Sequence, residues 1–413
     1  MFQPKIGIII SLILIFLATM FLWLGKTPFI VVEPDDQNSS SKIEQPAEPD
    51  DPDDTYINNE DPSDDSPSAE DPDDSALADG VILYEPTDPM ELPVDGATGW
   101  AGVTMPLYSE PDTESQKLSE FSDGQVFVII REHRDWWYVK SDTGKTGWVE
   151  HAGCLINLPD VIPSIVYNIT NAYSALTRSS GFEIPGVTGE KLYDAWSYNP
   201  RLFKEEFIVP SLYSSSKLLY KAQQLALEAG DTIIMHEAYR AHESQQRSVR
   251  LLQELMDENE EVNDAITTRP WSLSWFIATN ISNHQRGAAF DVNLGKIISQ
   301  DTRQIIGHHF QNVVTYEEYI MPTTIHELSP LAIALERPVS SRSRDAWREI
   351  PLAETMTPGA IRLQKYFDEA GLTPLASEWW HFNDLEGVAA AIDIGIRGTF
   401  YIENIMSILP RRE

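Results

Sequence analysis

The sequence has almost no cysteine. Cys154 is the only one among 413 residues, so no intrachain disulfide can form. Cysteines at CxxC or zinc-finger spacing are missing as well. These absences exclude a disulfide-stapled domain and a cysteine-ligated metal site. Because Cys154 follows a predicted β segment, we expect it to be a small buried apolar residue.

Basic residues are also scarce. The chain has 30 Lys and Arg against 64 Asp and Glu, a formal net charge of −34. Nucleic-acid binding requires basic patches that neutralise phosphates, so nucleic acid is excluded as a partner. Residues 33–79 hold 18 of the acids and a single base, Lys42. Hydrophobic residues make up 42% of the chain, which is ample for packed cores elsewhere and excludes a wholly disordered protein.

One long apolar run is present, at residues 6–24. It has no charged residue over 19 positions and lies between Lys5 and Lys26. At about 1.5 Å per residue, a helix of this length spans roughly the 30 Å hydrocarbon core of a bilayer. We therefore predict a single-pass membrane anchor in residues 1–32, with the remainder extracytoplasmic. A cleaved signal peptide is the alternative, but such peptides have shorter apolar runs and a small-x-small site.

Residues 33–95 have the composition of a disordered acidic linker. They are rich in Asp, Pro and Ser, and Pro52, Pro62 and Pro72 recur ten residues apart. A repeat this polar cannot bury enough apolar surface to fold. Calcium binding by the Asp clusters is an alternative, although the spaced glycine and the glutamate ligand of an EF-hand are missing.

Short β segments follow at 96–157. Residues 126–130 and 137–139 are predicted strands, with turns at Asp123-Gly124 and Thr143-Gly144. The segments from Gly124, from Trp137 to Lys140 and from Gly144 to Val149 resemble a bacterial SH3-like cell-wall module. We call residues 96–157 the SH3-like module. Its Trp136, Trp137 and Trp148 are expected in a barrel core, with a ligand platform as the alternative.

Residues 158–413 combine helices and strands. The patterns predict the following elements: a helix at 211–229 that ends at Gly230, a strand at 232–235, a helix at 243–256, and a helix capped by Thr357 that runs from Pro358 to Ala370 before Gly371. Because strands and helices do not alternate as regular βαβ units, the fold class is α+β.

The common zinc-protease signature HExxH is absent, since Pro330 stands where the second histidine would follow His326 and Glu327. A different set remains, in the segments SNHQRGAAFD at 282–291 and SEWWHF at 377–382. His284, Asp291 and His381 would give a zinc ion three ligands and leave one position open. Glu378 could then take a proton from water.

Spacing constrains how these residues can meet. On a continuous helix His284 and Asp291 would lie about 10.5 Å apart along the axis, too far for one zinc ion. The chain must therefore double back, and Gly287 permits a tight turn. Glu378 and His381 would face opposite sides of a regular strand, so we predict a turn or bulge between them.

The pattern SxHxxGxAxD at 282–291 and the ExxH at 378–381 together resemble the M15 peptidase family, the zinc D-alanyl-D-alanine carboxypeptidases and dipeptidases. Tyr239-Arg240 and the segment at 160–173 are also similar to that family, and the resemblance covers most of 158–400. It implies one zinc ion bound by His284, Asp291 and His381, Glu378 as general base and acid, and Arg240 at the developing oxyanion. For Arg240 a structural ion pair is the alternative.

The resemblance also points to substrate-binding residues. Ser282 and Tyr239 belong to the matching motifs, although Ser282 could instead form a local turn hydrogen bond. Dipeptidases of the family carry an acidic residue that receives the free amine of the substrate. His326 occupies that position here, with Glu327 one residue along.

Together these patterns predict a membrane-anchored zinc D-alanyl-D-alanine carboxypeptidase that acts on peptidoglycan stem peptides through activated water. We expect a monomer. A free-dipeptide dipeptidase and a wall endopeptidase are the alternatives within enzymes. A non-catalytic wall-binding or sensor protein is the alternative from another class, but a pure binder has no need of the general base Glu378.

Overall fold

The computed structural model describes residues 92–168, 176–177, 208–305, 308–402 and 404–408, all of which belong to one compact unit, Asp73–Glu413. The predicted anchor and residues 33–91 of the predicted linker lie outside these ranges. Among the described helices, none is long and apolar enough to cross a membrane. Residues 92–95, which were assigned to the linker, include the buried side chains of Leu92 and Val94.

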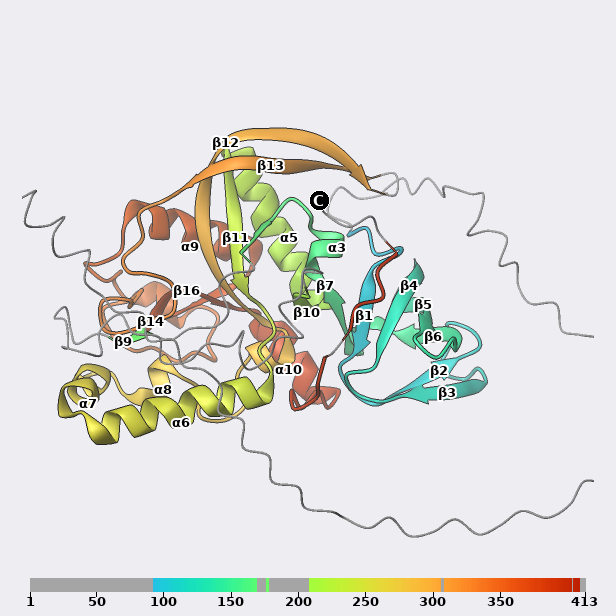
Figure 1. The fold of residues 1–413 in the computed structure, drawn as a ribbon, viewed down its shortest axis with the longest axis horizontal. Coiled ribbons are helices and arrows are strands. Elements are labelled where there is room, and N and C mark those ends of the chain that lie inside the picture. Colours follow the sequence, from blue (N-terminus) through green and yellow to red (C-terminus); the bar gives the residue numbers. More distant parts are fainter. Residues whose placement is uncertain (1–91, 169–175, 178–207, 306–307, 403, 409–413) are drawn as a thin grey trace, which may run out of the picture. The chain divides into compact units, whose positions relative to one another are not determined.

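Seven strands build the SH3-like module (Figure 1). They are β1 Thr98–Ala101, β2 Met105–Tyr108, β3 Lys117–Phe121, β4 Val126–His133, β5 Trp136–Ser141, β6 Thr146–Glu150 and β7 Cys154–Asn157. A short 3-10 turn, His151–Gly153, precedes β7. The predicted strands at 126–130 and 137–139 are confirmed and extend further. Cys154 is buried, as expected, and so are Trp137 and Trp148, while Trp136 is half-buried.

An eighth strand joins this sheet from later in the chain. β10 Pro210–Leu212 pairs antiparallel with β7, and the sheet order is β10-β7-β1-β4-β5-β6-β2-β3. The prediction of a helix from Ser211 is therefore wrong at its start, because helix α5 begins at Tyr213 and ends at Glu228. Apolar spacing could not reveal this, since Ser211 and Leu212 are held extended by hydrogen bonding to β7.

A second sheet carries the remaining strands, in the order β15-β16-β12-β11-β8, with β13 paired to β12. Their bounds are β8 Val166–Tyr167, β11 Asp231–Glu237, β12 Ala289–Ile305, β13 His308–Glu318, β15 Thr373–Leu375 and β16 Glu378–Asn383. A small separate pair joins β9 Leu176–Thr177 to β14 Glu327–Leu328. The predicted strand at 232–235 is confirmed within β11.

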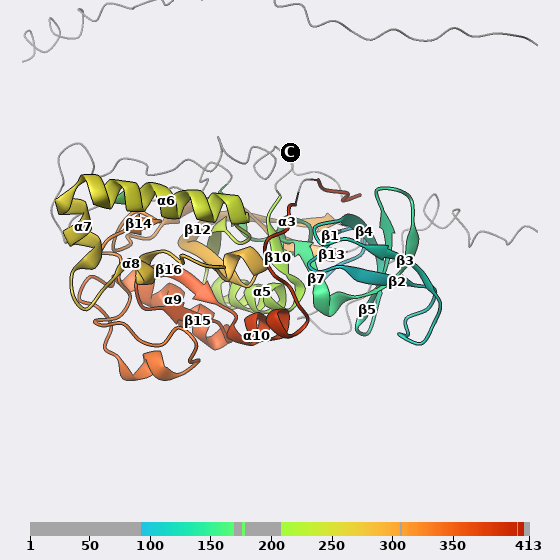
Figure 2. The same ribbon diagram turned by 90° about the horizontal axis from the view of Figure 1, so that it is seen from below.

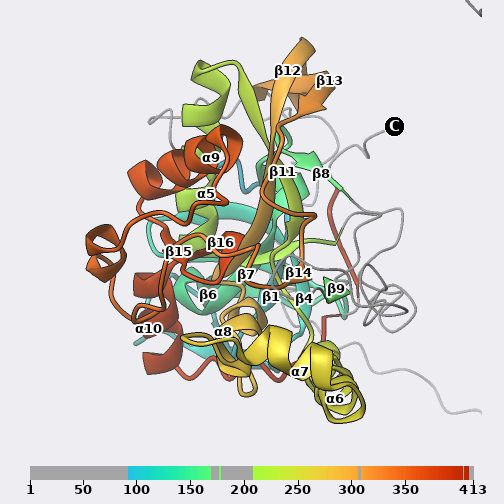
Figure 3. The same ribbon diagram turned by 90° about the vertical axis from the view of Figure 1, so that its left-hand side faces the viewer.

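Helices α5 and α9 (Pro358–Ala370) pack together on one face of the second sheet (Figure 3). Helix α6 (His242–Glu258) lies apart from this pair, beyond one end of the strands, where it contacts α7 (Glu260–Thr267) (Figures 1 and 2). The predicted helices at 243–256 and 358–370 are confirmed. The Thr357 hydroxyl accepts a hydrogen bond from Ala360 N at 3.3 Å, and Gly371 adopts the left-handed conformation with φ 102°.

The shorter helical segments are α3 Leu158–Val161, α7 Glu260–Thr267, α8 Leu273–Phe276, α10 Leu385–Asp393 and the 3-10 turns His284–Arg286 and Ala346–Glu349. The mixture of antiparallel sheets and helices without regular βαβ units agrees with the predicted α+β class.

Candidate metal centre

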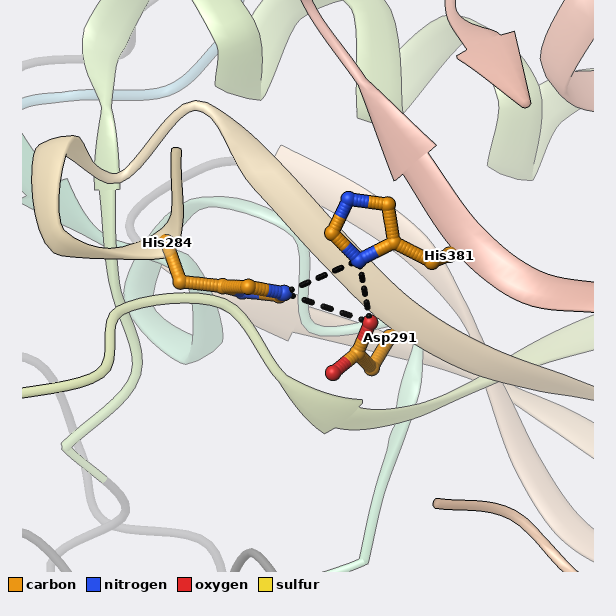
Figure 4. A group of neighbouring side chains, drawn as sticks. All are labelled: His284, Asp291 and His381. Atoms are coloured by element: carbon orange, nitrogen blue, oxygen red, sulfur yellow. Dashed lines mark hydrogen bonds and ion pairs between the residues drawn. The ribbon is translucent and has the colours of Figure 1, made fainter. Parts of the chain in front are cut away.

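Three buried side chains point toward one another at the end of β12 (Figure 4). His284 Nε2 lies 3.1 Å from His381 Nδ1 and 3.3 Å from Asp291 Oδ1, and His381 Nδ1 lies 2.9 Å from Asp291 Oδ1. No more than 10% of any of these three side chains is exposed. The structure thus brings the three predicted ligands together.

The backbone explains how residues distant in sequence converge. His284 begins a 3-10 turn that ends at Gly287, whose φ of 71° is strained for any residue with a Cβ. The chain then reverses into β12, where Asp291 pairs directly with His381 of β16. The tight turn predicted at Gly287 is therefore confirmed.

A bulge in β16 brings Glu378 and His381 to the same side. Pro374 of β15 pairs with Phe382, whereas the next residue, Leu375, pairs with Glu378. One step along β15 therefore spans four residues of β16, which confirms the predicted irregularity. Glu378 Oε2 lies 3.6 Å from His381 Nδ1 as a result.

Hydrogen bonds fix which nitrogen of each imidazole faces the centre. His284 Nδ1 lies 2.7 Å from the carbonyl oxygen of Ala238, to which it can only donate, so Nε2 is left with a lone pair. His381 Nε2 lies 3.0 Å from Asn383 Oδ1, and that oxygen also accepts from Asn283 Nδ2 at 2.7 Å. Neutral His381 with its proton on Nε2 would therefore offer the Nδ1 lone pair to a metal ion, in place of the hydrogen bond that Nδ1 makes to Asp291 Oδ1 without one.

These donor atoms fit a zinc ion. Tetrahedral zinc with bonds of about 2.0–2.1 Å to nitrogen and oxygen separates its ligand atoms by roughly 3.3 Å. The three separations of 2.9 to 3.3 Å lie close to that value. Two neutral imidazole nitrogens and one carboxylate are also a usual catalytic zinc set, with a fourth position left for water.

The electrostatics keep the carboxylate charged. Burial alone would raise the pKa of Asp291, but the charge of His284 and hydrogen bonds from the surrounding histidines hold this pKa well below its ordinary value. Burial lowers the pKa of His284. For His381, the hydrogen bond to Asp291 and the charge of that residue outweigh burial and raise the pKa. Asp291 is thus anionic at neutral pH, as a metal ligand would need to be.

Glu378 has the properties of a proton carrier. Burial raises its pKa to about 8, and the charge of Asp291 acts in the same direction, whereas the charge of His381 opposes them. A carboxyl group that titrates near neutral pH can both accept and return a proton. Its position beside His381 Nδ1 places it next to the three ligand atoms.

The guanidinium group of Arg240 is held in place by hydrogen bonds and ion pairs beside the centre. Its Nε donates to Glu237 Oε2 at 2.9 Å, Nη2 also pairs with that oxygen, and Nη1 donates to Gln245 Oε1 at 2.7 Å. Nη2 further contacts Asp291 Oδ2 at 3.3 Å. Arg240 is therefore both an ion-pair partner and a guanidinium that lines the cavity above the centre.

A second group of potential ligands shares Asp291. Glu237, Asp291 and His326 offer atoms within 4.8 Å of one another. The guanidinium of Arg240 already contacts both carboxylates of this group. Since one cation occupies that place, the arrangement favours a single metal ion, held by the first group.

The four residues predicted to contact substrate are placed differently. His326, with φ 62°, directs Nε2 to Asp291 Oδ2 at 3.1 Å and lines the cavity. Ser282 also lines it, and its hydroxyl accepts a hydrogen bond from His284 N at 3.1 Å, the local turn bond considered above.

Glu327 and Tyr239 bond elsewhere. Glu327 Oε1 accepts a hydrogen bond from Ser329 Oγ at 2.9 Å, and Tyr239 donates its hydroxyl to the Phe400 carbonyl at 2.7 Å. Neither of these two lines the cavity.

The cavity beside the centre has a volume of about 410 Å³. Its lining includes the apolar residues Trp275, Phe276, Ile277 and Trp380 together with Glu378, Arg240 and the three candidate ligands. The cavity thus combines apolar surface with a few polar groups, as small-molecule sites usually do.

Two supporting residues were not predicted from the sequence, Glu237 and Asn383. Asn383 could have been found, because it lies two residues after His381 on the same strand, and such positions share a face. Glu237 gave no such signal, since a bulge between Met235 and Glu237 sets its direction.

Comparisons with known proteins identify one part of the chain. Residues 101–155 match the family described as bacterial SH3 domain. This match supports the SH3-like module predicted at 96–157 and covers no residue of the candidate metal centre. No curated protein matches the chain.

Proposed function

We propose that the chain is a zinc metallopeptidase that removes the terminal D-alanine from peptidoglycan stem peptides. The observation that carries the proposal is the convergence of His284 Nε2, Asp291 Oδ1 and His381 Nδ1 within 3.3 Å, with Glu378 beside them. This set combines metal ligands with a group suited to proton transfer, which is the minimum for metal-assisted hydrolysis.

The residues divide the chemistry between them. A zinc ion held by the three ligands would supply Lewis acidity and make hydroxide available near neutral pH. Glu378, whose Oε2 lies 3.6 Å from His381 Nδ1, would take the proton from the attacking water and return it to the leaving amine. Arg240, which faces the cavity, stabilises the negative charge that develops on the carbonyl oxygen.

The substrate class is proposed from three features. The motifs at 282–291 and 378–381 resemble those of the zinc D-alanyl-D-alanine peptidases, and residues 101–155 match the bacterial SH3 domain. The apolar segment at 6–24 would anchor the chain in the cell membrane, and the acidic residues 33–79 would space the catalytic part from it. An anchored extracytoplasmic enzyme meets stem peptides rather than a cytoplasmic dipeptide.

The mechanism is tested by Glu378→Gln, which keeps the size of the side chain. We expect zinc to be retained and kcat to fall by about 10²–10⁴ on a stem pentapeptide, the usual contribution of a general base. Glu369→Gln, on the partly exposed side of α9, is the matched control and should keep full activity. A Glu378→Gln protein with zinc and full activity would contradict the mechanism, and wild-type protein purified without near-stoichiometric zinc would contradict the site.

The specificity is tested by comparing D-alanyl-D-alanine, a stem pentapeptide and cross-linked muropeptides by mass spectrometry. We expect release of one D-alanine from the pentapeptide. Cleavage of only the free dipeptide would instead define a dipeptidase, and cleavage of cross-links an endopeptidase. A non-catalytic binder would give no product with any of them and would keep muropeptide affinity after zinc removal.

A further inference from the structure

The loop that carries His284 rests on the sheet of the SH3-like module. The carbonyl oxygen of Gly287, three residues after His284, accepts hydrogen bonds from Leu212 N at 2.8 Å and from Ser211 Oγ at 3.1 Å. Ser211 and Leu212 belong to β10, which pairs with β7 of the module. The turn between two candidate ligands is therefore bonded to an edge strand of another sheet.

A side chain of the module reaches the same point. Leu155 pairs with Leu212 across the β7–β10 register and is fully buried. Its Cδ2 would lie 3.0 Å from a Cβ built on Gly287, and Leu212 N would lie 2.7 Å from it. Gly287 is thus pressed against β7 and β10 with no space for a side chain.

A second connection involves residues 396–402 and Asn404. Gln285 Nε2 donates to the Gly398 carbonyl and Arg286 Nε to the Ile396 carbonyl, both at 3.3 Å. The same residues are tied to the module, because Trp100 Nε1 donates to the Asn404 carbonyl at 3.0 Å. The loop residues that follow His284 are therefore attached to the module by two routes.

We propose that the SH3-like module, together with strand β10 paired to it, supports the metal centre, with Leu155 and Ser211 as positioning residues for His284. Metal ligands must be held to within about 0.5 Å, and a turn centred on glycine has no side chain of its own to lock it. Contacts from the module and from β10 hold this turn in place instead. This inference rests on the proposed function, since it assumes that His284 binds metal.

The experiment measures metal affinity in the full-length protein, by competition with a chromophoric zinc chelator. Leu155→Ala should weaken zinc binding by at least about tenfold, as changes around first ligands do. Leu107→Ala is the matched control: Leu107 is equally buried in the same module, but on β2, near the opposite edge of the sheet. Leu107→Ala should lower the midpoint temperature of thermal unfolding. It should leave zinc affinity within about twofold of wild type, because substitutions at distant sites act nearly independently.

Ser211→Ala provides a second variant that keeps the apolar packing intact, with Ser216→Ala, another fully buried serine, as its control. We expect weaker zinc binding for Ser211→Ala and unchanged binding for Ser216→Ala. If wild type binds zinc and both Leu155→Ala and Ser211→Ala bind it equally well, the inference is overturned. If wild type binds no zinc, the proposed function itself fails.

Discussion

Strand β12 has two halves that differ in nearly every respect. Residues 289–295 are all buried between neighbouring strands, whereas 296–304 are exposed apart from the half-buried Ile297 and pair only with β13 beyond Lys296. The outer half leaves the sheet as a two-stranded ribbon (Figure 1). The candidate ligand Asp291 lies in the buried half. Strand partners on both sides of β12 hold the backbone in place at Asp291, whereas the outer half has β13 as its partner on one side.

Removing the carboxylate from each half should give the largest contrast. Asp291→Ala deletes a candidate metal ligand and the partner of Arg240 and His326. We therefore expect loss of zinc and a fall in activity of at least about a thousandfold, no smaller than the loss of one oxyanion donor. Asp301→Ala, at an exposed position of the same strand, should change neither. Metal analysis and D-alanine release measure both variants. Equal losses of zinc and activity in the two variants would contradict the expected difference between the buried and exposed halves of β12.

A smaller contrast is expected for the asparagines that flank the two halves. Asn383 accepts from His381 Nε2, so Asn383→Leu should weaken zinc affinity by about 10–100-fold, the usual effect of removing a partner that orients a ligand. Asn312 of β13 bonds only the exposed Asp301 among the contacts described, and Asn312→Leu should leave affinity unchanged. Chelator competition distinguishes them. An unchanged affinity for Asn383→Leu would show that His381 is oriented by other contacts.

The stability of the fold should also depend on pH, because Glu378 is buried beside Asp291. The pKa of Glu378 is about 8 in the fold against an ordinary 4.5, so between these values the folded chain binds more protons than the unfolded one. The free energy of unfolding should therefore fall as pH rises from about 5 to 8, by up to about 1.4 kcal/mol per pH unit. Urea denaturation with a chelator present should show this slope for wild type and a shallower one for Glu378→Gln. Equal slopes would contradict the raised pKa.

The smallest effect is expected on the ribbon surface. Ile298 is 60% exposed, so Ile298→Ser should change the free energy of unfolding by no more than about 0.5 kcal/mol. Val292→Ser, in the fully buried half, should cost several times more, because it buries a hydroxyl in an apolar core. Urea denaturation measures both. A large loss for Ile298→Ser would mean that the ribbon packs on something beyond β12 and β13.

The sequence predicted elements whose determinants are local. The cap at Thr357, the turn at Gly287 and the bulge after Glu378 follow from residue type and spacing, and the structure shows all three. The extended conformation of Ser211 could not be predicted, because it depends on pairing with Ile156, more than fifty residues earlier in the chain.

The candidate site also has parts that the sequence could predict and parts that it could not. The candidate ligands His284, Asp291 and His381 could be proposed from the sequence, mainly through the resemblance of their two motifs to the M15 peptidases, and the structure places them together. The hydrogen-bond partner of His284 could not, since the Ala238 carbonyl lies just after β11 and reaches His284 through the pairing of β11 with β12. Tyr239 lies beside Arg240 in sequence, yet its ring stacks on Phe400.

The pairing between the chain's late segment and the SH3-like module has a consequence for the order of assembly during synthesis. Met406 N donates to Thr98 Oγ1, a contact between residues 308 positions apart, and Ile408 N donates to the Gly96 carbonyl. Such distant contacts close a very long loop and form slowly. A ribosome must therefore synthesise the chain beyond Ile408 before the module acquires these two hydrogen bonds. Until then β1 can pair with β4 and β7, but the Gly96 carbonyl and the Thr98 hydroxyl lack these two donors.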